Sequence, residues 1–262
     1  MVKYLLYIPL IIAIIGCEKT QVVENDISFQ EFIVVNAQLN SGNAFGGVTF
    51  TKTIPLGITY NIKDAELKDV TAYIKINGVQ IVPLHYVSDG VYKPLNDLSI
   101  GEGYTYELFA EWRGTFIYSK TQAPYFPEIK SAQYIAGGQY LQAELKAHPG
   151  EVYGAIWLIV NSSAENKIFP SLSIPGSTES TVSVITSSIP FVYTGSNYNG
   201  LRYIQVFAYD KQYADYFNSA KFNAPNNNAF LSSGGSVGWN VYGNNVIGMF
   251  IGVAIGASRN VN

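Results

Sequence analysis

The chain has 262 residues, a formal net charge of −3 and only 13% charged residues. This acidic balance argues against nucleic acid and anionic lipid as partners, because both attract basic surfaces. The 20 tyrosines, 14 phenylalanines and 24 glycines favour strands joined by turns, so the composition predicts a mainly β protein of one large domain or two ordinary ones.

The beginning of the chain has the pattern of an export signal. Lys3 supplies a positive start, residues 5–15 are almost entirely apolar, and Gly16 precedes Cys17, the only cysteine of the chain. The apolar run is shorter than the roughly 20 residues that a membrane-spanning helix needs. Residues 1–16 are therefore predicted to be a signal peptide.

The sequence Ile14-Ile15-Gly16-Cys17 resembles the bacterial lipobox, in which the cysteine is acylated and becomes the new amino terminus. Exported chains rarely keep an unpaired thiol, so lipidation explains Cys17 better than the alternative of an ordinary cleaved signal. Two or more acyl chains hold a protein firmly, so the lipid alone would attach the chain to the outer membrane. Residues 17–30 are polar without periodicity and are predicted to be a lipidated tether.

Short β-branched and aromatic runs separated by turn residues fill the first half of the chain. Residues 70–76 alternate apolar and polar side chains, which is typical of a half-buried strand. The pair Asn77-Gly78 follows at once and predicts a hairpin, since both turn positions need positive φ. Roughly seven such strands predict that residues 31–123 form an antiparallel Ig-like or carboxypeptidase-regulatory-like sandwich.

Two prolines, Pro124 and Pro127, interrupt the strand pattern, because proline cannot donate to a β-ladder and stiffens the chain. We therefore expect a domain boundary there and a second, β-rich domain over residues 124–262. Residues 155–160 and 246–255 are nearly continuous apolar runs, which predicts strands buried in the middle of a sheet.

One helix is predicted in the second half. Tyr213, Tyr216 and Phe217 recur at helical spacing with polar residues between them. This aromatic stripe is typical of a helix, near residues 210–220, that packs on the second sheet.

Several of these segments also carry a family resemblance. They are Cys17-Glu18-Lys19, residues 32–36, 48–53, 103–108 and 121–124, and residues 213–217 with 240–252. Together they resemble an uncharacterised family of Bacteroidota envelope lipoproteins that is known only as a domain of unknown function. The resemblance implies an envelope lipoprotein, often encoded near TonB-dependent transporters with a carboxypeptidase-regulatory-like domain, and it implies no established activity.

Motifs for catalysis or metal binding are not recognisable in the sequence. It contains neither a phosphate loop nor a His-Glu-x-x-His motif. The two histidines, His85 and His148, lack a second ligand at metal-binding spacing and are interpreted as surface or turn residues. No cofactor and no metal are therefore predicted.

Three carboxylates, Asp64, Glu66 and Asp69, lie close enough in sequence to surround a calcium ion. Lys63 and Lys68 lie among them, and the spacing fits no calcium-loop pattern. A solvated turn is the better interpretation of this segment.

Aromatic residues in glycine- and asparagine-rich loops are the remaining indication of a binding site: Tyr193, Tyr198, Trp239 and Tyr242. Flat rings beside amide groups suit sugar rings or peptide side chains, so a glycan or a peptide is the expected ligand. The alternative is that these rings close the ends of the sandwich as part of the core.

These observations predict a non-enzymatic lipoprotein of the outer membrane, attached through Cys17, that acts as an accessory or ligand-capture subunit. A TonB-dependent transporter is a possible partner. The main alternative is a structural or adhesive surface protein that acts without a transporter. An enzyme acting on envelope polymers is a third hypothesis, since paired carboxylates need not be adjacent in sequence. The sequence leaves open whether the protein faces the cell surface or the periplasm.

Overall fold

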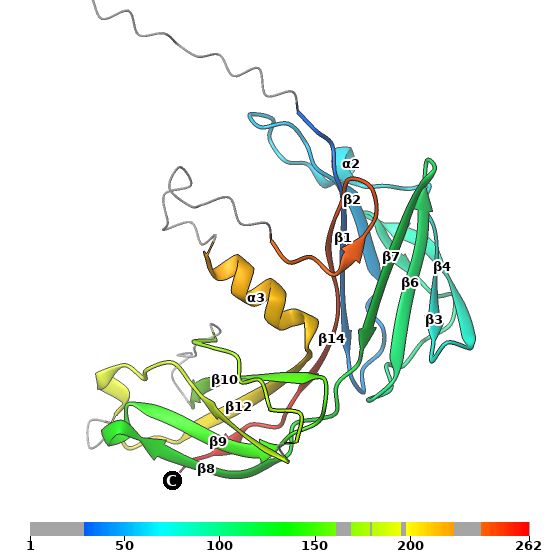
Figure 1. The fold of residues 1–262 in the computed structure, drawn as a ribbon. Helices are drawn as coiled ribbons and strands as arrows, with labels where there is room; N and C mark the ends of the chain where they lie inside the picture. Colours follow the sequence, from blue (N-terminus) through cyan, green and yellow to red (C-terminus); the bar gives the residue numbers. More distant parts are fainter. Residues whose placement is uncertain (1–28, 161–168, 179, 195–197, 223–236, 262) are drawn as a thin grey trace, which may run out of the picture. The chain divides into compact units, whose positions relative to one another are not determined.

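The computed structural model describes residues 29–160, 169–178, 180–194, 198–222 and 237–261 (Figure 1). The predicted signal peptide and Cys17 lie outside these residues, as does the predicted tether up to residue 28. The chain divides into the units Met1–Gln30 and Glu31–Asn262, and the second unit holds every strand and helix described below. None of the helices in the described residues combines the length and the hydrophobicity that a membrane span requires.

The fold is mainly β, with short helices, as the composition predicted. The first half contains β1 (Ile33–Asn40), β2 (Val48–Lys52), α2 (Ile62–Ala65), β3 (Thr71–Ile76), β4 (Gln80–Ser88), β5 (Val91–Lys93), β6 (Thr105–Trp112) and β7 (Thr115–Gln122). The second half contains β8 (Ile129–Ile135), β9 (Tyr140–Lys146), β10 (Glu151–Ile159), β11 (Thr181–Ile185), η2 (Phe191–Tyr193), β12 (Arg202–Asp210), α3 (Gln212–Phe222), β13 (Val241–Tyr242), β14 (Val246–Ile255) and β15 (Arg259–Asn260).

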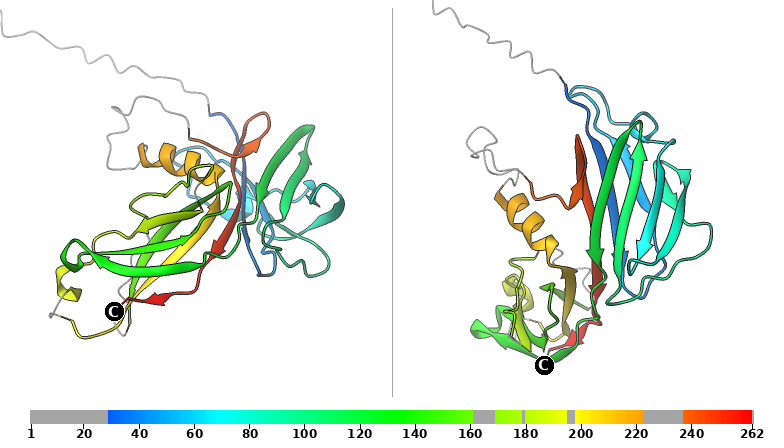
Figure 2. Two further views of the ribbon diagram at one scale, coloured as in Figure 1. Left: turned by 60° about the horizontal axis from the view of Figure 1, so that its bottom comes forward. Right: turned by 45° about the vertical axis from the view of Figure 1, so that its right-hand side comes forward.

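The first half forms a β-sandwich. Strands β14, β1 and β2 lie in one layer, strands β4, β3, β6 and β7 lie in the other, and β5 pairs with both β2 and β4 (Figure 2). Alternate side chains of the two layers meet in one core, which contains the fully buried residues Val35, Phe50, Ile74 and Leu108. The alternation of apolar and polar residues in these strands therefore encodes which face is inside.

The predicted hairpin at Asn77-Gly78 is confirmed. Asn77 has φ 49° and Gly78 has φ 71°, and the turn joins β3 to β4 with Ile76 opposite Gln80. Asparagine and glycine tolerate positive φ better than other residues, so this pair fixes both the turn and the register of the strands that follow.

Strand β14 links the two halves. It runs parallel to β1 along the whole of β1, and its last residues run antiparallel to β12. Every other strand pairing in the described part of the chain is antiparallel. The burial expected for residues 246–255 is confirmed, whereas the parallel partner was not predicted, because β1 lies at the other end of the sequence.

Glycines allow β14 to approach its neighbours closely. A Cβ atom at Gly248 would lie 1.9 Å from the carbonyl oxygen of Val35, and one at Gly252 would lie 2.1 Å from that of Gln122. Neither position has room for a side chain. The predicted boundary near residue 124 stays a prediction, and the structure adds that the first core includes residues from beyond it, namely Val241, Val246 and Phe250.

The second half packs two sheets against each other. Strands β10 and β12 continue the sheet beyond β14, and β8, β9 and β11 form a separate three-stranded sheet among the described residues. Leu141 of β9, Tyr153 of β10 and Val206 of β12 are fully buried in the core between them. The predicted helix is confirmed as α3, whose Tyr213 stacks on Tyr209 with ring centroids 4.1 Å apart.

The close approach at Gly252 can be tested by adding one methyl group. We expect Gly252→Ala to lower the free energy of unfolding by about 2–3 kcal/mol, because the new Cβ would overlap the backbone of β7 and force a shift. Urea unfolding followed by circular dichroism measures the change.

Gly46→Ala is the matched control for that variant. No heavy atom lies within 4 Å of a Cβ built at Gly46, so this substitution should change the free energy of unfolding by no more than about 0.5 kcal/mol. Equal stability of Gly252→Ala and Gly46→Ala would mean that the packing of β14 against β7 is looser than described.

Candidate functional site

Two of the predicted binding residues, Tyr193 and Tyr198, lie together. Their rings are perpendicular with centroids 5.4 Å apart, and both pack against the core of the second half. The hydroxyl of Tyr198 donates to the carbonyl oxygen of Val160 at 2.6 Å, and the guanidinium of Arg202 lies 5.3 Å from the ring centroid of Tyr198. The surroundings of this pair are those of rings that close one end of a core.

The other two predicted residues, Trp239 and Tyr242, have different neighbours. Trp239 is 37% exposed, and its ring lies 5.6 Å from that of Tyr216 in α3. Tyr242 is 58% exposed in β13, where it pairs with Tyr118 of β7. A binding role for the four predicted residues stays a prediction, and Tyr242 is the one that leads to a larger aromatic surface.

That surface is a row of four rings across the sandwich. Tyr73 of β3 lies opposite Phe109 of β6, Phe109 lies opposite Tyr118 of β7, and Tyr118 lies opposite Tyr242 of β13. Ring centroids are 5.1 Å apart both between Tyr73 and Phe109 and between Phe109 and Tyr118. We call Tyr73, Phe109, Tyr118 and Tyr242 the aromatic row.

The aromatic row lies on the outer face of its layer because strand residues alternate. Ile74, Leu108 and Ile117 follow or precede members of the row and point into the core, where each is at most 2% exposed. Row residues are therefore half-buried by their neighbours or exposed, and none belongs to the core of the sandwich.

Charged groups lie along one side of the aromatic row. Glu107 is flanked in register by Lys75 and Lys120, and the Nζ atom of Lys120 is 3.8 Å from its carboxylate. The hydroxyl of Tyr118 donates to the same carboxylate at 3.1 Å. Burial and this hydrogen bond raise the pKa of Tyr118, so the hydroxyl stays protonated at neutral pH.

A hollow lies along the row. It has a volume of about 250 Å³ and includes Tyr73, Phe109 and Tyr118 of the row among its lining residues. Its other lining residues include Thr71, Glu111 and Phe116, and the Phe116 ring is 73% exposed. The hollow thus combines aromatic walls with hydroxyl and carboxylate groups.

The three carboxylates weighed as calcium ligands do not converge. Asp64 is exposed, whereas Asp69 accepts a hydrogen bond from the indole nitrogen of Trp112 at 2.8 Å. Glu66 is only 7% exposed, so the interpretation of the segment as a solvated turn is wrong for this residue. Within the described residues, no group of three or more His, Cys, Asp or Glu side chains could hold a metal ion.

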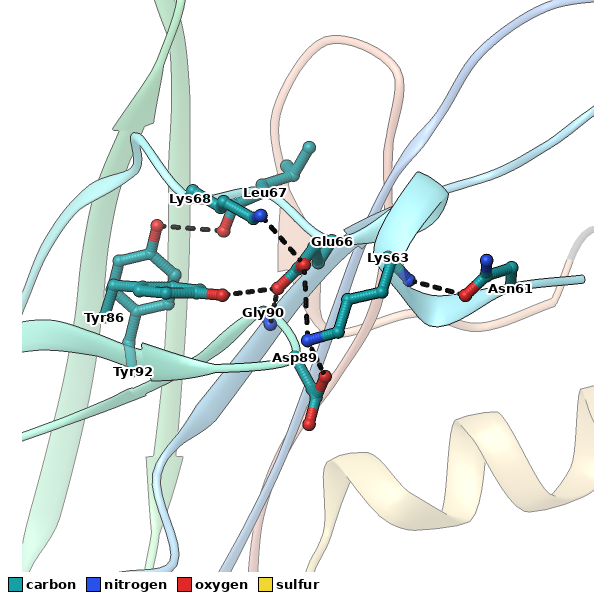
Figure 3. Close-up of polar contacts among 9 residues, drawn as sticks. All are labelled: Asn61, Lys63, Glu66, Leu67, Lys68, Tyr86, Asp89, Gly90 and Tyr92. Carbon is teal, nitrogen blue, oxygen red and sulfur yellow. Dashed lines mark hydrogen bonds and ion pairs between the residues drawn. The ribbon is translucent and has the colours of Figure 1, made fainter.

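Glu66 is buried because several donors surround its carboxylate (Figure 3). It accepts hydrogen bonds from the hydroxyl of Tyr86 and the backbone nitrogen of Gly90, and its other oxygen lies 3.1 Å from the Nζ atom of Lys68 and 3.7 Å from that of Lys63. The hydrogen bond from Tyr86 is the largest cause of the lowered pKa of Glu66. Through these hydrogen bonds the carboxylate of Glu66 holds the segment after α2 against β4 and against the β4–β5 turn.

The two histidines have different surroundings. His85 is exposed on β4, as expected for a surface residue. His148 is half-buried, and its ring stacks on Tyr125 with centroids 4.6 Å apart. Burial lowers the pKa of His148, so its ring is neutral at pH 7.

Sequence reasoning missed two buried carboxylates, Glu151 and Asp210, which lie opposite each other on β10 and β12. Glu151 accepts hydrogen bonds from the backbone nitrogen of Tyr125 and the hydroxyl of Tyr153, each at 2.7 Å. Burial raises the pKa of Glu151. No sequence motif marks these residues, and their role is to hold the segment after β7 against the second half.

Comparison with known proteins does not assign the chain to a family. No family model matches the chain, and no curated protein matches it. The resemblance to the Bacteroidota lipoprotein family therefore stays a prediction.

Replacing Glu66 with glutamine keeps the shape of the side chain but removes the charge that two lysines face. A carboxyl group whose pKa is lowered by folding stabilises the protein above the pKa of the unfolded chain, about 4.5, and this contribution is lost as the pH falls through the lower folded value. We expect Glu66→Gln to be less stable than the wild type at neutral pH and to lose less stability on acidification. Urea unfolding at neutral pH and at about pH 3 measures both effects.

Asp64→Asn is the control for the charge change, because Asp64 is exposed on the same short segment. This variant should follow the wild type at both pH values. If Glu66→Gln also follows the wild type, the ionised carboxylate does not stabilise the fold.

Proposed function

We propose that this chain is a lipid-anchored, non-enzymatic protein of the outer membrane that captures a glycan on the aromatic row. The observation that carries the proposal is the outward-facing row itself, in which four rings from four strands lie in register beside a hollow of about 250 Å³. Rings that serve only packing are normally covered, whereas Tyr242 and Phe116 are mostly exposed.

The hollow is lined mainly by apolar groups with a few polar ones among them, and this combination suits a sugar ring. A sugar ring presents C–H groups that pack on aromatic rings and hydroxyl groups that need hydrogen-bond partners. The hollow supplies Phe109 and Phe116 for the first, and Thr71 and Glu111 for the second. Pockets for drug-sized ligands measure roughly 300–1,000 Å³, so this smaller hollow suits one ring of a longer chain.

Two single substitutions at the hollow test the proposal. We expect Phe116→Ala and Tyr118→Ala each to raise the dissociation constant for a bound polysaccharide about three- to tenfold, the loss expected for one aromatic contact. Affinity electrophoresis through separate gels that contain dextran, laminarin, xyloglucan or mannan measures binding to each polysaccharide.

Phe191→Ala is the matched control, because Phe191 is 78% exposed on η2 in the second half of the chain. It should migrate like the wild type in every gel. The proposal fails if none of the polysaccharides retards the wild type, or if the Phe116 and Tyr118 variants are retarded as strongly as the wild type.

Lipid attachment at Cys17 is the second part of the proposal and rests on the lipobox alone. Cys17→Ser removes the thiol that would carry the diacylglycerol, so incorporation of radioactive palmitate should disappear and the protein should remain unprocessed or leave the membrane. Labelling of whole cells followed by immunoprecipitation measures this. Palmitate that persists in the variant would exclude Cys17 as the acylated residue.

A TonB-dependent transporter is the partner that the family resemblance implies. Capture of a glycan on the aromatic row would supply such a transporter with substrate. The alternative role in adhesion uses the same surface without a transporter, and the two roles differ in whether a transporter co-purifies with the chain in mild detergent.

A further inference from the structure

The loop between β2 and α2 carries apolar side chains that point away from the protein. Leu56 is 102% exposed, Ile58 is 59% exposed and Tyr60 is 61% exposed. No heavy atom lies within 4 Å of a Cβ built at Gly57, which places this residue at a projecting tip. Residues 53–61 contain no charged side chain. We call residues 54–60 the apolar loop.

The apolar loop leaves the sandwich where the folded unit begins. The backbone nitrogen of Thr53 donates to the carbonyl oxygen of Phe32 at 2.9 Å, and the Nζ atom of Lys52 lies 2.9 Å from the carboxylate of Glu31. The start of β1 and the β2–α2 loop accordingly lie at the same end of the sandwich (Figure 1).

The length of the predicted tether limits how far this end can be from a membrane. Fully extended, residues 17–30 span at most about 50 Å, and a flexible chain of this length has an average end-to-end distance of about 20 Å. A lipid on Cys17 therefore keeps Glu31, and with it the base of the apolar loop, close to the lipid head groups.

We propose that the apolar loop inserts into the interfacial region of the lipid bilayer and forms a second membrane contact beside the lipid on Cys17. Leucine and isoleucine side chains gain by leaving water, and a tyrosine suits the boundary between head groups and acyl chains. The inference rests on the lipid attachment proposed above.

A lipid surface fits this loop better than a protein partner does. A stable protein interface covers about 800 Å² on each side, which three side chains on one projecting tip cannot provide. Insertion into lipid needs no complementary surface. Because the nearest lysines, Lys52 and Lys63, are already paired with Glu31 and Asp89, the contact does not depend on anionic lipid. The anchor also raises the effective concentration of the loop at the bilayer, so a weak insertion suffices.

Hydrogen exchange on a chemically anchored chain tests the proposal. The mature chain, residues 17–262, is coupled through the thiol of Cys17 to a maleimide lipid in phosphatidylcholine vesicles, so the result does not depend on whether cells acylate the protein. We expect amide exchange in residues 53–61 to slow at least threefold relative to the uncoupled chain, as measured by mass spectrometry. Residues 94–98, at the other end of the β2–β5 pair, should exchange at the same rate in both samples.

A double variant and a matched control distinguish insertion of the apolar loop from a general slowing of amide exchange by the nearby vesicle surface. Leu56→Ser with Ile58→Ser should abolish the slowing, whereas Leu95→Ser, which removes an 81% exposed side chain elsewhere, should leave it intact. Equal exchange of residues 53–61 in the coupled and uncoupled chains would overturn the proposal. Slowing of the same size in residues 53–61 and 94–98 would also overturn it, and so would slowing that persists in the double variant. Failure of palmitate labelling at Cys17 would contradict the lipid attachment on which the inference rests, whereas the exchange measured on the coupled chain tests insertion of the loop by itself.

Discussion

The buried carboxylate of Asp210 is the group on which the arrangement of the two halves depends. One of its oxygens accepts hydrogen bonds from the hydroxyl of Thr121 and the backbone nitrogen of Gln122, and the other accepts from the backbone nitrogen of Gln212 at the start of α3. The hydroxyl of Thr121 in turn accepts from the backbone nitrogen of Gly252. A buried carboxyl group needs such hydrogen-bond partners, and these contacts bring β7, β12, α3 and β14 together at this point.

Local features of the fold could be predicted from the sequence because their causes are local. The Asn77-Gly78 turn and the helix around Tyr213 follow from backbone preferences and from the spacing of a few neighbouring residues. The alternation in residues 70–76 also placed Tyr73 on the outer face. The pairing of β1 with β14 and the burial of Glu66 could not be predicted, since their partners are distant in sequence and carry no motif. The aromatic row depends in the same way on the registers of three strand pairs.

The aromatic row and the apolar loop occupy different parts of the folded unit. The row crosses the outer face of the layer that contains β3, β6 and β7, whereas the loop projects from the end at which β1 starts. Occupation of one therefore leaves the other accessible. A protein held at a membrane by a lipid and a loop would keep its ligand surface in a restricted orientation, and this shortens the search for a ligand that arrives along the membrane plane.

The parallel pairing of β1 with β14 also sets the order in which the chain can fold. The first core lacks Val246 and Phe250 until the segment that forms β14 has been released, although its first strand begins at Ile33. Contacts between such distant segments form slowly, because the entropy of closing the intervening chain opposes them. Until then one edge of β1 remains unpaired, and unpaired apolar edges are where incomplete chains associate with one another. A holding chaperone that covers this edge of β1 until β14 has been synthesised and can pair with it would raise the yield of folded protein.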